Sequence, residues 1–136
     1  MDAAAGFALF RACADPERLF VKGLRYGRPA LDIAFTAGMS LFETLLLGHP
    51  MRDINGQPTM FHRAFFETWR EPPDDFALDL YAYWRARVAG LTIDRIPVSF
   101  GPRAFGTSHW NSGMAARLKF SRRTLDYSLR LRREAR

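Results

Sequence analysis

The stretch RDINGQPTMFHR, residues 52–63, decides how the chain is expected to fold, because it separates two apolar segments. Its first half crowds an aspartate, an asparagine, a glycine and a proline into positions 53–58. These residue types favour tight turns. The stretch therefore predicts a loop that begins near Asp53 and leads into an aromatic segment.

Helices and strands alternate on both sides of this loop. Residues 30–48 predict a helix that Gly48 and Pro50 would end. Its apolar face would consist of Leu31, Phe35, Phe42, Leu45 and Leu46. The same reasoning predicts helices at 5–13, 62–70, 76–90 and 114–135, and strands at 19–23 and 91–100. Residues 58–61 fit either a short strand or the entry to a helix. Pro97 indicates either an edge position for the last strand or a shift in its register. The alternation predicts an α/β fold with its polar motifs on loops.

Composition limits the class of protein. The chain has 136 residues, 48% of them hydrophobic, which suffices for one domain with a packed core. Cys13 is the single cysteine, so no internal disulfide framework is expected. The start lacks the basic region of a signal peptide. Glu43 interrupts the densest apolar run, LFETLLL, so no membrane-spanning helix is expected.

Positive charge is concentrated in the C-terminal tail. Residues 1–100 hold 11 Lys/Arg and 12 Asp/Glu, whereas residues 101–136 hold 9 and 2. This asymmetry predicts an anionic partner: a membrane, a phosphate or a nucleic acid. The tail also carries an apolar stripe, which consists of Trp110, Met114, Leu118, Leu125 and Leu129. A basic helix with such a stripe is typical of a membrane interface. Packing against its own domain is the alternative, and no nucleic-acid-binding motif is recognised.

Two aspartates are candidate catalytic groups. Asp53 can act as a base or accept a hydrogen bond from a sugar hydroxyl, or it can simply accept backbone N–H bonds within the turn. Asp79 opens the helix at 76–90. It acts as a base if it faces a cleft; otherwise it complements the helix dipole.

Three arginines, Arg25, Arg28 and Arg103, lie on glycine-bearing loops. The planar guanidinium group suits two-pronged contact with phosphate, so these residues predict a phosphate clamp. The alternative for each is a solvated surface charge. The three histidines lack the spacing of metal ligands, so no metal site is predicted within the chain.

Five segments occur in an order that resembles a known family of enzymes. They are VKGLRYGRP (21–29), GMSLFETLLLG (38–48), RDINGQPTMFHR (52–63), DFALDLYAYWRARVAGL (75–91) and IPVSFGPRAFGTSHWN (96–111). Together they resemble the inverting nucleotide-sugar glycosyltransferases of family 2 type that include the dolichyl-phosphate mannose synthases and their bacterial polyprenyl-phosphate relatives. The resemblance runs from about residue 5 to the end, and it implies the C-terminal, acceptor-side half of a GT-A fold.

The resemblance also implies roles for the candidate residues. Arg25 and Arg28 would reach the lipid phosphate of the acceptor, and Arg103 with Ser108 would close over the phosphates. Asp53 and Asp79 remain alternative candidates for the base. Residues 1–109 would form the half-domain. Residues 110–136 would form an amphipathic helix that seats the enzyme on the cytoplasmic face of a membrane, and no nucleic-acid partner is expected.

One half of the family's fold has no counterpart in this sequence. That half binds the nucleotide and holds the DxD pair that anchors a divalent metal, Mg or Mn, against the diphosphate of the nucleotide-sugar donor. The chain is therefore expected to be a fragment that is inactive alone: the product of a truncated gene, of an internal start, or one half of a split protein that works with a separate N-terminal half. The alternative is a small basic membrane- or nucleic-acid-binding protein without catalysis.

Overall fold

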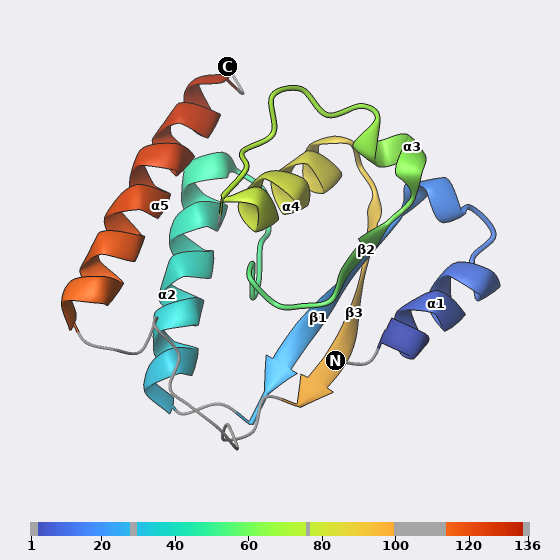
Figure 1. Ribbon diagram of the computed structural model, residues 1–136, viewed down its shortest axis with the longest axis horizontal. Helices are drawn as coiled ribbons and strands as arrows, with labels where there is room; N and C mark the ends of the chain where they lie inside the picture. Colours follow the sequence, from blue (N-terminus) through green and yellow to red (C-terminus); the bar gives the residue numbers. More distant parts are fainter. Residues whose placement is uncertain (1–2, 28–29, 76, 100–113, 135–136) are drawn as a thin grey trace.

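The computed structural model describes residues 3–27, 30–75, 77–99 and 114–134, with the side chains of the last segment described from Arg122 onward (Figure 1). Arg28, Arg103, Ser108 and Trp110 lie outside the described residues, as do the side chains of Met114 and Leu118. The helices are α1 (Ala3–Ala12), the 3-10 turn η1 (Pro16–Arg18), α2 (Ala30–Leu47), α3 (Arg63–Phe66), α4 (Leu78–Val88) and α5 (Met114–Glu134). The strands are β1 (Leu19–Tyr26), β2 (Thr59–Phe61) and β3 (Thr92–Ser99).

The three strands form one mixed sheet in the order β2-β1-β3. The central strand β1 pairs with β2 in antiparallel fashion and with β3 in parallel, from Leu19 opposite Thr92 to Tyr26 opposite Ser99. The predicted α/β class is confirmed at this level, and Pro97 does lie on an edge strand. The strand predicted to end at Gly23 instead continues to Tyr26, because β3 pairs with it along its whole length.

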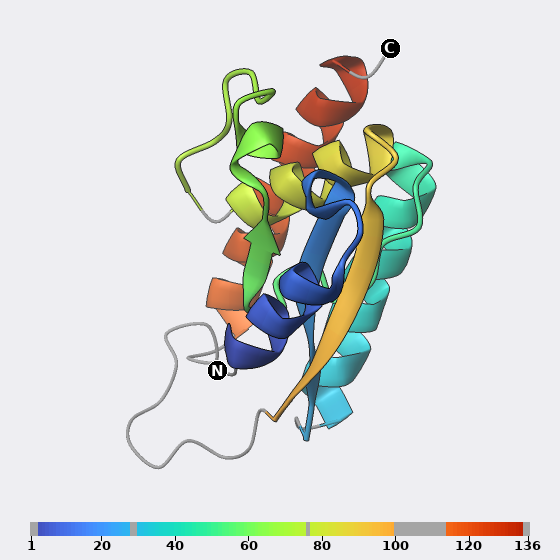
Figure 2. The ribbon, with the colours of Figure 1, turned by 90° about the vertical axis from the view of Figure 1, so that its right-hand side faces the viewer.

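The core has two parts, one on each face of the sheet. Leu19, Val21 and Ile96 pack beneath α1, which covers one face. On the other face, Phe20 lies between Phe61 and Tyr83, with both ring pairs stacked nearly parallel. Helix α4 packs there, and α2 and α5 lie side by side on the opposite side of the sheet from α1 (Figures 1 and 2).

Helix α2 turns its apolar face outward. Its buried residues are Ser40, Glu43 and Leu47, whereas six large apolar side chains are exposed: Leu31, Ile33, Phe35, Leu41, Phe42 and Leu45. By length and composition α2 could cross a membrane, with a mean hydropathy of 1.5 over 18 residues. The expectation that no segment is long and apolar enough to span a membrane was therefore wrong, because the 18 residues of α2 reach that length and hydropathy although Glu43 is among them.

Candidate functional site

The carboxyl ends of β1 and β3 are the place where parallel strands usually present binding groups, because the loops that leave them meet at one edge of the sheet. Both strands point to this edge in Figure 1. Arg28 follows the end of β1 in the sequence, and Arg103 and Ser108 follow the end of β3, all three outside the described residues. The described part of the site is built from β1, the loop at 51–58 and the first turn of α4.

Asp53 and Arg25 form the centre of this site. The Asp53 carboxylate accepts hydrogen bonds from the backbone N–H and the Nε of Arg25, both at 2.9 Å, and its Oδ1 also contacts the terminal guanidinium nitrogen. The pair is largely buried, with side-chain exposures of 6% and 16%. The backbone of Asp53 has a positive φ of 44°, a conformation that a residue other than glycine adopts uncommonly and that surrounding contacts hold here. The two residues singled out in separate motifs thus meet in an ion pair.

The loop that carries Asp53 lies directly against β1. The N–H of Gly23 donates to the carbonyl of Pro58 at 2.8 Å. A Cβ at Gly23 would lie 2.1 Å from the carbonyl oxygen of Gln57, and one at Gly56 would lie 2.2 Å from the carbonyl oxygen of Gly23. Only glycine permits so close an approach of two backbones. These glycines bring the carboxylate of Asp53 within reach of Arg25.

Arg95 ties the same loop to β3. Its guanidinium donates to the carbonyl oxygens of Arg52 at 2.6 Å, Gly23 at 2.9 Å and Asp53 at 3.2 Å, and it lies over the ring of Tyr83. Burial lowers the pKa of Arg95 from its ordinary value. Sequence reasoning missed this residue, although an arginine within an apolar strand segment, at RIPV, is a detectable signal.

Lys22 and Asp79 complete the described site. Lys22 is fully buried, and its Nζ donates to Thr59 Oγ1 at 2.9 Å. Burial lowers the pKa of Lys22 to about 8, and the nearby Asp79 opposes that shift. Asp79 is half-buried, and its Oδ1 accepts a hydrogen bond from Gln57 Nε2 at 2.9 Å. Asp79 therefore faces the loop at 51–58 that carries Asp53, and it also lies in the first turn of α4, where a carboxylate complements the helix dipole.

The charges of these described side chains do not cancel. Lys22, Arg25 and Arg95 are three cations, whereas Asp53 and Asp79 are two carboxylates, so one positive charge is in excess. Such an excess beside a loop edge favours an anionic ligand. Among the described residues, no group of three or more His, Cys, Asp or Glu side chains is placed to hold a metal ion.

The tail helix α5 packs against α2 through Thr124, Ser128 and Leu131, all of which are buried. Leu125 and Leu129, two members of the predicted apolar stripe, are about 40% exposed on its outer side. Packing against its own domain, the alternative considered for the tail, is therefore observed for one face of α5. One face packs on the domain, and the other presents apolar and basic side chains to the exterior.

No family model, curated protein or solved structure matches this chain.

Proposed function

We propose that this chain forms the acceptor-binding side of a membrane-associated glycosyltransferase, which moves a sugar from a nucleotide donor to a polyprenyl-phosphate-type acceptor. The observation that carries the proposal is the Asp53–Arg25 pair at the carboxyl end of β1. It joins the acidic turn to Arg25, which was expected on a loop but lies near the end of β1, and the glycosyltransferase resemblance assigns both segments to one cleft.

The geometry supports different roles for the two aspartates. Both carboxylate oxygens of Asp53 accept hydrogen bonds from Arg25, so Asp53 acts by positioning that arginine and the end of β1. Asp79 is half-buried and is held by the amide of Gln57. A carboxylate that is oriented but not locked into an ion pair suits proton transfer better. Asp79 is therefore the proposed base, and Arg28 and Arg103 complete the phosphate contacts.

Binding of a lipid phosphate is the direct test on this chain. Farnesyl phosphate in detergent micelles should shift the amide NMR signals of residues 23–27 and 53–57, and farnesol should not. Arg28→Ala should weaken binding by roughly ten- to a hundredfold, which is the usual worth of a charged hydrogen bond. Arg63→Ala, an exposed arginine on α3, is the matched control. Equal binding of farnesol, or an Arg28→Ala variant that binds normally, would contradict the proposal.

Sugar transfer is tested on the full reading frame that encodes this chain. The proposal expects the coding sequence upstream of Met1, or an adjacent gene, to encode a nucleotide-binding half with paired aspartates. In membranes that hold both halves, Asp79→Asn should lower transfer of labelled sugar to farnesyl phosphate by at least about a hundredfold. Asp74→Asn, an exposed neighbour, should leave it unchanged. Normal transfer by Asp79→Asn would remove this residue from the reaction.

A further inference from the structure

Glu43 is a carboxyl group buried between two helices, one turn along α2 from Ser40, whose hydroxyl accepts a hydrogen bond from the N–H of Asp53 at 3.1 Å. Its side chain is fully buried on α2, and its Oε1 lies 2.5 Å from Ser128 Oγ on α5. Its second oxygen, Oε2, is buried without a hydrogen-bond partner. A buried carboxylate with one neutral partner is costly, because nothing replaces the hydration that the charge has lost.

The hydrogen bonds of Ser128 indicate which protonation state fits this packing. Ser128 Oγ also lies 2.7 Å from the carbonyl oxygen of Thr124, and a hydroxyl has one proton to donate. If Glu43 is protonated, it donates to Ser128, and Ser128 donates to Thr124. If Glu43 is ionised, Ser128 can donate to only one of the two acceptors, and a charged Oε2 remains unpaired. The neutral acid satisfies the arrangement better.

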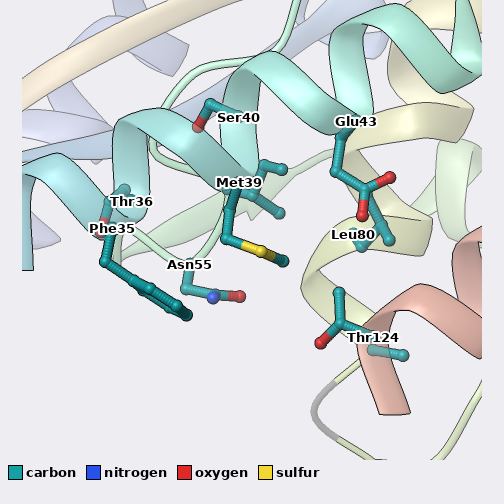
Figure 3. Close-up of a pocket in the computed structure, with 10 residues that line it drawn as sticks. Phe35, Thr36, Met39, Ser40, Glu43, Asn55, Leu80 and Thr124 are labelled. Atoms are coloured by element: carbon teal, nitrogen blue, oxygen red, sulfur yellow. The ribbon is translucent and has the colours of Figure 1, made fainter. Parts of the chain in front are cut away.

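The surroundings of Glu43 supply no compensating charge. Figure 3 shows its carboxyl group directed toward Leu80 on α4 and Thr124 on α5, beside a cavity of about 40 Å³. That volume has room for a water molecule or two. The other residues that line this cavity come from α2, from the loop at 54–55, from the start of α4 and from α5. They are Phe35, Thr36, Met39, Ser40, Ile54, Asn55, Ala77, Leu80 and Thr124. Among these described residues none is charged or titrates near neutral pH.

We propose that the packing of α5 against α2 takes up a proton at Glu43, so that acid strengthens this contact and rising pH weakens it. The inference does not depend on the proposed glycosyltransferase function. Burial raises the pKa of Glu43 from 4.5 to about 7, and the hydrogen bond from Ser128 only partly opposes this. The contact is strongest below pH 4.5, where both packed and released forms are protonated. It weakens as pH rises toward 7, because the released form loses its proton first.

Hydrogen exchange of the α5 amides tests the proposal. Between pH 5 and 8, the protection of residues 122–134, corrected for intrinsic exchange rates, should fall on the order of 10²-fold relative to β1 amides. Glu43→Gln keeps the shape and a donor for Ser128 but cannot ionise, so its α5 protection should stay constant. Glu67→Gln removes an exposed carboxyl group just after α3 and should behave like the unchanged protein.

Two results would overturn the proposal. One is α5 protection that does not depend on pH in the unchanged protein, or that falls equally in Glu43→Gln. The other is measured without a substitution, from the carboxyl NMR signal of Glu43 in the ¹³C-labelled protein. This signal should titrate near pH 7, and titration at its ordinary value of 4.5 would show that the packing binds no proton.

Discussion

Gly56 is the residue on which the closeness of the acidic loop to β1 depends. A Cβ there would lie 2.2 Å from the carbonyl oxygen of Gly23 and 2.9 Å from Asp53 Oδ2. Backbone atoms cannot move aside as a flexible side chain can, so Gly56→Ala should lower the free energy of unfolding by about 2 kcal/mol or more. Urea denaturation measures this change.

Gly38, in the middle of α2, is the matched control for Gly56. A Cβ at Gly38 meets nothing within 4 Å. Gly38→Ala should raise stability by up to about 1 kcal/mol, because alanine favours the helix. If both variants lose stability equally, the close approach at Gly56 is not what constrains the loop.

The candidate residues could be found from the sequence, but their partners could not. Asp53 and Arg25 were recognised as members of separate motifs, and their ion pair spans 28 positions that no local pattern connects. Lys22, Arg95 and Glu43 were missed for a related reason. Each lies in an apolar segment, where a charged residue is usually interpreted as pointing to solvent. Their burial results from tertiary packing, which a single sequence does not specify.

At the scale of elements, β3 holds the loop of Asp53 through one side chain. Arg95 donates to three carbonyl oxygens, from Arg52, Gly23 and Asp53. Arg95→Ala would leave the partly buried carbonyls of Gly23 and Asp53 with fewer donors and should destabilise the fold by about 2 kcal/mol. Arg85→Ala is the control, since Arg85 is also half-buried but donates to the single carbonyl of Thr68 and should cost less, about 1 kcal/mol.

Hydrogen exchange would localise the effect of Arg95→Ala. Amides of the loop at 51–57 should exchange faster in this variant, whereas those of α1 should not. Unchanged exchange in the loop would mean that Arg95 contributes only its packing against Tyr83.

Most elements were predicted correctly in type, and the errors concern their length and orientation. The helix expected at 62–70 spans only Arg63–Phe66, because the N–H groups of Thr68 and Trp69 bond three residues back, to Phe65 and Phe66, in tight turns that end the α-helix. The apolar face of α2 was identified from spacing, yet periodicity alone does not indicate whether that face points inward. The sheet and α5 leave it exposed.

For the whole molecule, α2 and α5 lie side by side (Figure 1), so the helix that exposes apolar side chains adjoins the helix that exposes basic ones. The exposed arginines among the described side chains of α5 are Arg122, Arg123, Arg130, Arg132 and Arg133. Apolar side chains beside arginines favour the surface of an anionic leaflet, where each cation contributes about 1 kcal/mol. The proposed membrane association therefore depends on α2 as much as on the stripe of the tail.

Vesicle sedimentation tests this surface. Binding to phosphatidylcholine vesicles with added phosphatidylglycerol should fall about tenfold or more in Leu45→Glu, which places a charge at a side chain that is 75% exposed. Phe7→Glu, at an exposed site of α1 on the opposite side of the sheet, should bind normally. Equal effects of the two substitutions would argue against a membrane-facing role for α2.

The stacked rings around Phe20 give the protein its own optical reporter. Trp69 lies edge-on to Phe65 and Tyr81, and Trp84 is buried against Tyr81. Indoles held rigidly among other rings produce strong near-ultraviolet circular dichroism and blue-shifted fluorescence, and both signals vanish when the rings separate. Because these rings connect β1, β2, α3 and α4, loss of the signal marks the moment at which the sheet and its covering helices come apart.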